Sequence, residues 1–194
     1  MTVPSPTSVV FERGPRVHLR PYCEADIPLI LVWLNEPNTR RYLSRVFPLN
    51  EAEEQEFVRR PYGPGAAHES FIIVLSATNT PIGCTGLHQI DWVSRKAELG
   101  IFIGSEENRA QGLGTEAFQL AMRHAFEGLN LHRVSLTVFA FNDRAIQSYE
   151  RIGFIREGVD REAHFVEGEY VDIIRYSMLA REWFAKTDRP PRSR

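Results

Sequence analysis

The spacing of hydrophobic and polar residues changes along the chain, and each spacing predicts one type of element. Residues 71–75 (FIIVL) form a short apolar run rich in β-branched side chains, which is typical of a buried strand. A turn at 79–81 (NTP) reverses the chain, and strands are expected over 82–91 and 98–103. These three segments predict an antiparallel meander, and a short first strand is expected at 16–19.

Four segments carry the signals of helices. The first opens at Asp26, and the second, 51–60, follows Asn50; both side chains can accept a hydrogen bond from a helix start. Between 118 and 129 the apolar residues fall on one face of an amphipathic helix. The same kind of stripe predicts a fourth helix over 143–152.

Capping residues fix the bounds of this last helix, and strands surround it. Asn142 or Asp143 can cap its start, and Gly153 suits the left-handed position after its end. Strands are expected on both sides of it, at 134–141, 154–158 and 170–179. The order is strand, two helices, three strands, helix, strand, helix and two strands, which predicts a mixed α/β sheet.

Composition is that of one ordinary globular domain. The 194 residues include 43% hydrophobic and 25% charged residues. We expect the domain over 16–185, a flexible N-terminal segment at 1–15 and a flexible tail at 186–194. The net charge of -2 does not favour nucleic-acid binding, and we expect neither a membrane span nor a secretion signal. The two cysteines, Cys23 and Cys84, form no disulfide framework, so we expect free thiols and a cytoplasmic protein.

The segment 109–115 (RAQGLGT) is the part of the sequence that most clearly indicates a ligand. It lies between a strand and a helix start, where glycines and unpaired N–H groups can hold an anion such as a pyrophosphate. A P-loop is excluded because no lysine follows either glycine. A dinucleotide site remains open because 112–117 (GLGTEA) fits GxGxxA, although the preceding meander is the wrong context. A glycine-rich turn without a ligand is the third interpretation.

Two motifs together give a resemblance to a known family. The segment 109–114 resembles (Q/R)xxGx(G/A), the acetyl-CoA loop of the GNAT superfamily of N-acetyltransferases. The segment 142–154 (NDRAIQSYERIGF) is similar to the NxxAxxxYxxxGF helix of that family at every fixed position. The resemblance covers about 16–179 and implies a mostly antiparallel sheet of about seven strands with about four helices. Ala110 departs from it, since relatives often carry glycine there, and its methyl group is tolerable if the local φ is negative.

The resemblance also implies where acetyl-CoA binds. The fourth strand splays from the fifth, and its free main chain pairs with the pantetheine arm through Ile101, Phe102 and Ile103. Asn142 is then expected to bond the cofactor arm as well as cap its helix, and Tyr149 to stand near the thioester sulfur. Main-chain N–H groups of the loop hold the pyrophosphate, with help from the side chain of Arg109; the loop residues are Arg109, Ala110, Gln111, Gly112, Leu113, Gly114 and Thr115.

Transfer of the acetyl group to an amine needs an acid for the leaving thiolate and a base for the amine. A tyrosine with pKa about 10 can protonate a thiolate of pKa about 8.5 at a cost of about 2 kcal/mol, so Tyr149 is the candidate acid. Glu98 is the candidate base, and His88 and Asp91 are weaker candidates. The chemistry needs no metal, and no cluster of residues has the spacing of metal ligands.

The acceptor is a primary amine whose identity the sequence leaves open. The C-terminal half resembles both ribosomal-protein alanine N-acetyltransferases and spermidine N-acetyltransferases, so a protein N-terminus and a polyamine-like molecule are both candidates. Aminoglycosides and amino acids are not excluded. The resemblance implies direct attack of the amine in a ternary complex and is compatible with a homodimer. The alternative function is a catalytically silent CoA-binding module of the same fold.

Overall fold

A computed structural model describes residues 9–60 and 63–187 of the chain. Its helices are α1 (Ile27–Asn35), α2 (Pro37–Arg40), α3 (Glu51–Val58), α4 (Leu113–Arg123), α5 (Asp143–Ile152) and α6 (Ala180–Thr187). Its strands are β1 (Glu12–Arg13), β2 (Val17–Pro21), β3 (His68–Leu75), β4 (Thr80–Asp91), β5 (Lys96–Ile103), β6 (Arg133–Phe139), β7 (Ile155–Val166) and β8 (Glu169–Leu179). None of the helices within these residues is both long and apolar enough to cross a membrane.

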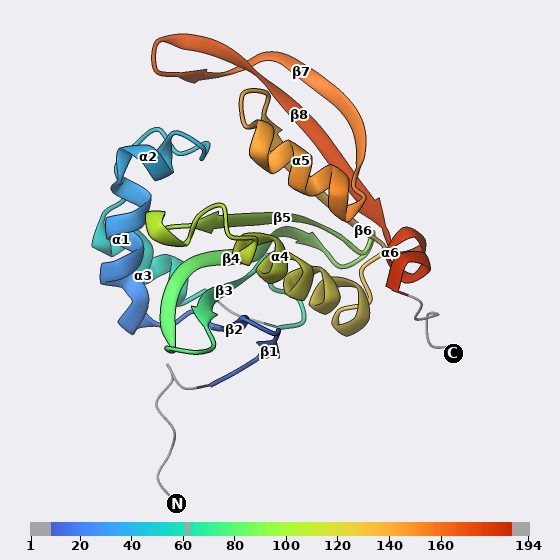
Figure 1. The fold of residues 1–194 in the computed structure, drawn as a ribbon, viewed down its shortest axis with the longest axis horizontal. Coiled ribbons are helices and arrows are strands. Elements are labelled where there is room, and N and C mark those ends of the chain that lie inside the picture. Colours follow the sequence, from blue (N-terminus) through green and yellow to red (C-terminus); the bar gives the residue numbers. More distant parts are fainter. Residues whose placement is uncertain (1–8, 61–62, 188–194) are drawn as a thin grey trace, which may run out of the picture.

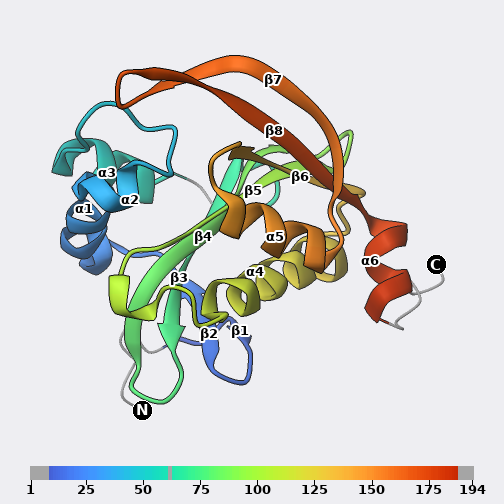
Figure 2. The same cartoon turned by 45° about the horizontal axis from the view of Figure 1, so that its top comes forward.

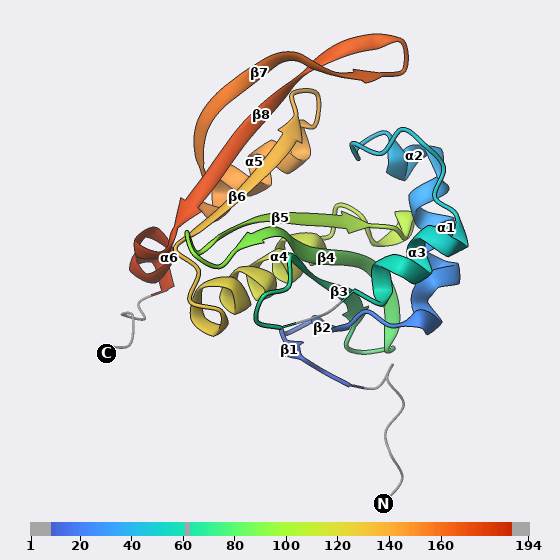
Figure 3. The ribbon, with the colours of Figure 1, turned by 180° about the vertical axis from the view of Figure 1, so that it is seen from behind.

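The strands form one sheet in the order β1-β2-β3-β4-β5-β6-β8-β7. All neighbours are antiparallel except β5 and β6, which run parallel and pair at only three positions, Lys96–Glu98 with Arg133–Ser135. Beyond Glu98 the two strands separate, and Figure 3 shows β6 leaving the line of β5 beside α5. The mixed, mostly antiparallel α/β fold and its splay are therefore confirmed, with eight strands and six helices in place of the approximate seven and four.

Two layers of helices cover opposite faces of the sheet, because successive strand residues point to opposite sides. On one side, Ile73, Leu87 and Leu99 pack with Phe118 of α4 in the larger hydrophobic core. On the other side, Ile72 and Phe102 pack with residues of α1 and α3 in a second core. Figure 3 shows α1 and α3 from the side opposite to the view of α4 in Figure 1.

Local signals fixed most helix ends correctly. Asn50 accepts a hydrogen bond from Glu53 N–H (3.0 Å), and Gly153 has φ 104° in the left-handed position after α5. Asp26 is an exception, because its side chain makes no capping bond to α1. It is buried and accepts hydrogen bonds from Arg20 (2.8 Å) and from Cys23 N–H (3.1 Å), since a buried guanidinium needs a carboxylate partner.

Several elements have no counterpart in the sequence-based prediction. Residues 9–15, expected to be a loose end, include β1, and Phe11 stacks on Phe71 with ring centroids 5.0 Å apart. Lys186 and Thr187, expected to belong to the tail, end α6. The remaining parts of both expected loose ends, 1–8 and 188–194, lie outside the described residues.

The C-terminal hairpin is longer than the pattern indicated. β7 continues to Val166, past the predicted strand 154–158, whereas β8 agrees with the predicted 170–179; the hairpin of both strands projects beyond the rest of the sheet toward α2 (Figure 2). The polar sequence of 160–164 (DREAH) hides this extension, because both faces of a projecting hairpin are exposed to water. Near its tip, Glu167 forms an ion pair with Arg41 after α2 (3.2 Å).

Candidate active site

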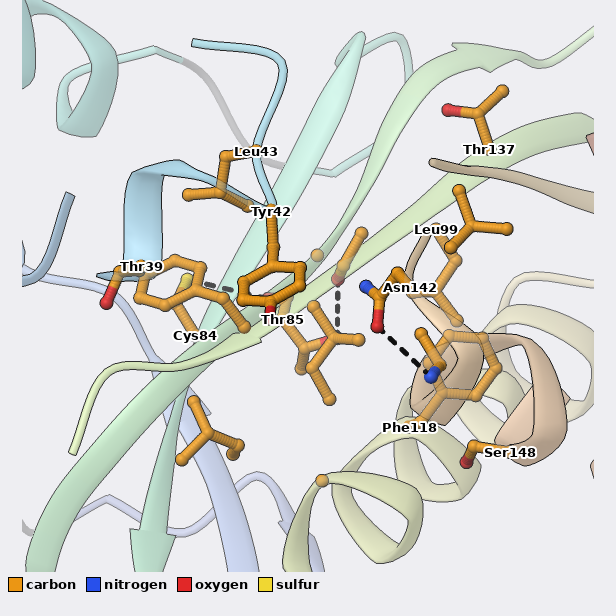
Figure 4. Close-up of a pocket in the computed structure, with 18 of the residues that line it drawn as sticks. Thr39, Tyr42, Leu43, Cys84, Thr85, Leu99, Phe118, Thr137, Asn142 and Ser148 are labelled. Atoms are coloured by element: carbon orange, nitrogen blue, oxygen red, sulfur yellow. Dashed lines mark hydrogen bonds between the residues drawn. The ribbon is translucent and has the colours of Figure 1, made fainter. Parts of the chain in front are cut away.

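The separation of β5 from β6 opens a cavity of about 820 Å³. We distinguish two arms of it. The cofactor arm lies along β5, the 109–115 loop and α5, and the acceptor arm lies between the segment after α2, α3 and β4. Figure 4 shows Tyr42 and Cys84 on one side of the cavity and Asn142 on the other. The cavity thus joins the glycine loop to a second space large enough for another molecule.

Main-chain groups of β5 face the gap in alternation. Gly104 N–H donates to Ile82 O of β4 (2.9 Å), and in an antiparallel ladder alternate residues turn their N–H and C=O groups toward one partner. Phe102 therefore points its main chain at β4, while Ile101 and Ile103 point theirs into the gap. The Ile103 carbonyl already accepts a hydrogen bond from Arg109 Nε (3.0 Å). The register leaves the Ile101 groups and Ile103 N–H for an extended ligand, whereas Phe102 lines the cavity with its side chain.

The glycine loop has the backbone that an anion site requires. Gly112 has φ 77° and caps α4, whose first N–H groups, at Leu113, Gly114 and Thr115, have no partner within the helix. A Cβ atom on Gly114 would come 3.4 Å from the Ile103 side chain, so a side chain there would occupy the space beside β5. These N–H groups and the positive end of α4 suit the pyrophosphate of acetyl-CoA.

Ala110 corrects an expectation. Its φ is 62°, in the left-handed region, and not the negative value under which a methyl group was tolerable. A Cβ in that region crowds the backbone, so the position that relatives often fill with glycine is strained here by about 1 kcal/mol or somewhat more.

The two long side chains of the loop form hydrogen bonds with the protein itself. The Arg109 guanidinium donates to Thr39 Oγ1 of α2 (2.6 Å) and to the Gly104 carbonyl (3.2 Å) as well as to Ile103. Gln111 donates to Glu107 O (2.7 Å). Arg109 thus ties the end of β5 to α2, and its direct contact with a phosphate stays a prediction.

Two contacts hold α4 and α5 in place around the cofactor arm. Asn142 Oδ1 accepts a hydrogen bond from Ala145 N–H (3.3 Å), which confirms the predicted cap and leaves its NH₂ group for a ligand (Figure 4). Thr115 and Ser148 share a hydrogen bond between their hydroxyl groups (2.9 Å). The helix that carries Tyr149 is therefore anchored to the start of α4.

Tyr149 is well placed for an acid. It lines the cavity from α5, and its ring packs against Phe118 (centroids 5.3 Å) and Phe154 (6.2 Å). Burial raises its pKa to about 12, so the phenol is fully protonated at neutral pH. Burial also raises the pKa of the Cys84 thiol in the same cavity to about 12. Cys84 is therefore a neutral thiol at neutral pH.

The three candidates for the base have different surroundings. Glu98 lies at the point where β5 and β6 part, and its Oε1 accepts a hydrogen bond from Thr137 (3.1 Å). His88 stands directly opposite Glu98 on β4. Asp91 does not line the cavity; it accepts hydrogen bonds from Val93 and Ser94 N–H in the turn after β4.

Sequence reasoning missed residues that act across long distances in the chain. Arg16 donates to Gln111 O (2.9 Å) and pairs with Glu116 of α4 (2.9 Å), which fixes the loop to the start of β2. Thr39 and Arg45 reach the cavity from the segments around α2. No local motif marks these residues, since each partner lies far away in sequence. In the described part of the chain, no group of three or more His, Cys, Asp or Glu residues could hold a metal ion.

A split sheet, a glycine-capped helix start beside the split and a protonated tyrosine opposite define an acyl-CoA-binding transferase. The chain belongs to the GNAT acetyltransferase family: the family model described as "Acetyltransferase (GNAT) domain" matches residues 16–155. It is an acetyl-CoA-dependent N-acetyltransferase domain, as the resemblance implied, and the dinucleotide and ligand-free interpretations of the loop are not supported.

Similar proteins are named for different acceptors. YdaF of Bacillus subtilis (strain 168), named for ribosomal N-acetylation, is 40% identical over 101 residues, which are 52% of this chain and 55% of YdaF. A spermidine N(1)-acetyltransferase of Vibrio cholerae (serotype O1, strain ATCC 39315 / El Tor Inaba N16961) is 29% identical over 156 residues, covering 79% of this chain and 89% of the relative. The crystal structure of spermidine N-acetyltransferase from Vibrio cholerae with CoA and spermine has TM-score 0.78 and 27% identity, and covers 87% of this chain and 98% of that chain.

Proposed function

We propose that the acceptor is the α-amino group of a protein or peptide N-terminus. The observation that carries this proposal is Arg45, which lines the acceptor arm. Its Nε atom is buried and has no hydrogen-bond partner among the described residues, while its Nη2 donates to Glu53 (2.7 Å). The side chain as a whole is 37% exposed and lines the cavity, so its outer N–H groups can donate to an acceptor atom of the substrate.

A peptide and a polyamine differ in whether they can supply it. The first carbonyl group of a peptide follows its α-amine directly and can accept from Arg45. Spermidine carries amines alone, which are donors when protonated. The carboxylates that line the cavity are Glu54 and Glu98, and both already accept a hydroxyl hydrogen bond, from Tyr22 (2.6 Å) and Thr137 (3.1 Å). The same cavity is lined by the arginines Arg45, Arg109, Arg144 and Arg151, so its charge is better suited to a neutral amine beside a carbonyl than to a polycation.

A polyamine is the second candidate, because the Vibrio cholerae relative with 89% coverage is a spermidine acetyltransferase. The catalytically silent CoA-binding module is the remaining alternative. The retention of Tyr149 in the cavity favours an enzyme over such a module.

The transfer itself follows from the two arms meeting in one cavity. The amine attacks the thioester carbonyl directly in a ternary complex, forming the C–N bond as the C–S bond breaks. Tyr149 gives its hydroxyl proton to the departing sulfur, and Ile101, Ile103, Asn142 and the N–H groups of 112–115 hold the cofactor. Bringing both reactants together in this way removes most of the entropic cost of the encounter.

An acceptor panel tests the proposal. Thiol release from acetyl-CoA would be followed with N-terminal peptides, spermidine, spermine, an aminoglycoside and free amino acids. We expect peptides to have the highest kcat/KM. Arg45→Lys, which keeps the charge but removes the guanidinium N–H groups, should raise KM for peptides and leave any activity with spermidine unchanged. Efficient use of spermidine with no peptide activity, or a peptide KM unaffected by Arg45→Lys, would rule out this acceptor class. Silence with every amine despite acetyl-CoA binding would favour the module.

Assembly and location are part of the same proposal. Self-association as a homodimer is supported by the family resemblance, and a Vibrio cholerae relative forms a dodecamer. Light scattering would give the mass of the particle. The unpaired thiols of Cys23 and Cys84 support a cytoplasmic location.

A further inference from the structure

Three titratable side chains lie in one row across the sheet. His68 of β3 is directly opposite His88 of β4, and His88 is directly opposite Glu98 of β5. Residues that face each other in this way have Cβ atoms about 4.5–5.5 Å apart and share one face of the sheet. That face is the one toward α3, and both His88 and Glu98 line the cavity there.

The next row gives the imidazole of His88 its direction. It consists of Ser70, Gly86 and Gly100, which are again directly opposite one another. A Cβ atom on Gly100 would come 3.3 Å from His88 Nε2 and 3.4 Å from Cδ2. The Nε2 edge of the ring therefore lies over Gly100, where a larger residue would displace it. Gly100 is also the second residue beyond the last pairing of β5 with β6, so Nε2 faces the start of the gap.

His88 and Glu98 differ in what already occupies them. The Glu98 carboxylate accepts a hydrogen bond from Thr137 Oγ1 (3.1 Å). Neither ring nitrogen of His88 has a hydrogen-bond partner among the described residues, although the side chain is half-buried. The imidazole thus has an unoccupied lone pair for a substrate proton, whereas Thr137 holds one oxygen of the Glu98 carboxylate, which stands beside the ring as a negative charge.

We propose that His88 is the base that takes the proton of the attacking amine, and that Glu98 is a positioning residue that stabilises the imidazolium which results. This inference rests on the acetyl transfer proposed above, whichever amine is accepted. As the neutral amine forms its bond to the carbonyl carbon, His88 Nε2 accepts one N–H proton. The C–S electron pair leaves on sulfur, which takes the Tyr149 hydroxyl proton. The proton then passes from His88 through solvent to Tyr149, and both side chains return to their starting states.

The surroundings keep the base available at neutral pH. Burial lowers the pKa of His88 below its usual 6.5, His68 lowers it further, and the charge of Glu98 opposes both. The imidazole is therefore neutral at pH 7 and becomes protonated as the pH falls below 6.5. Acetyl transfer from a saturated complex should accordingly lose rate on the acid side of pH 6.5.

The experiment is the single-turnover rate as a function of pH, with saturating acetyl-CoA and the best amine of the panel. For His88→Ala we expect the rate at pH 7 to fall by about 100-fold and to recover in part when imidazole is added. The acid limb of the profile, which is the fall in rate below pH 6.5, should disappear. Glu98→Gln should keep the limb but move it to lower pH, because the charge that favours the imidazolium is gone. His132→Ala, at an exposed position outside the cavity, is the control and should behave as wild type.

Several results would overturn the assignment. If Glu98→Gln abolished the acid limb while His88→Ala kept it, Glu98 would be the base. Unchanged single-turnover rates in His88→Ala would remove His88 from the reaction. As a folding control, acetyl-CoA must still raise the melting temperature of His88→Ala. If that variant does not fold, the same criteria apply to His88→Gln, which keeps the volume and polarity of the side chain. A wild-type protein silent with every amine would overturn the proposed function as well, whereas active wild type with an unaffected His88 variant overturns this inference alone.

Discussion

Replacing Ala110 with glycine should stabilise the protein, although it removes side-chain atoms. Ala110 has φ 62° in an exposed turn before α4. The left-handed region costs an L-residue about 1–2 kcal/mol, and glycine does not pay this cost. Glycine also makes the unfolded chain more flexible, which offsets about 0.4–1 kcal/mol. The difference is a net gain of about 0.5–1 kcal/mol in the free energy of unfolding.

Thermal and urea unfolding would measure this gain. For a chain of this length it corresponds to a rise of about 1–4 °C in Tm. The matched control is Ala52→Gly, an exposed alanine in the first turn of α3, where glycine should cost up to about 0.5–1 kcal/mol. The two variants make the same chemical change and should move Tm in opposite directions. If Ala110→Gly destabilised the protein as Ala52→Gly does, the loop would not hold the left-handed conformation and the strain argument would be refuted.

Three further predictions concern the site and the acid stability. Tyr149→Phe should lower kcat and kcat/KM alike by about 100-fold in steady-state kinetics. Its affinity for acetyl-CoA, measured by calorimetry, should stay within a few-fold of wild type. A change in affinity alone would make Tyr149 a positioning residue. Gly114→Asp adds a negative charge that suits the helix dipole of α4 but repels a pyrophosphate. The Tm of the free variant should therefore equal that of wild type, whereas the rise in Tm with acetyl-CoA should disappear. A retained rise would place the cofactor elsewhere. The Arg133 guanidinium lowers the pKa of Glu157 from 4.5 to about 2, so this carboxylate stabilises the fold above pH 4.5 and loses that effect as pH falls toward 2. Urea unfolding should therefore show a smaller loss of stability between pH 4.5 and 2 for Glu157→Gln than for wild type, and equal losses would contradict the pairing.

Much of the fold and part of the site could be predicted from the sequence. The meander of β3, β4 and β5, the helix α5 and its caps at Asn142 and Gly153 depend on contacts within a few residues. The glycine loop and Tyr149 both line the cavity, and they could be proposed from the sequence because short motifs contain them; their roles stay predictions. The part of β7 beyond residue 158 was missed, since an exposed hairpin strand has no hydrophobic alternation to reveal it, whereas β8 was predicted.

The sequence by itself determined the family, the cofactor and the elements that hold it, because these follow from periodicity and from motifs whose residues are close together. Only the tertiary structure decided that the Arg109 guanidinium turns to Thr39, that Ala110 has a positive φ, and that the Nε2 edge of His88 lies over Gly100. Each of these depends on strand register or on a contact between distant segments. A shift of one residue in the pairing of β4 with β5 would turn His88 to the opposite face of the sheet, and nothing in the local sequence excludes that shift until the two cores have packed.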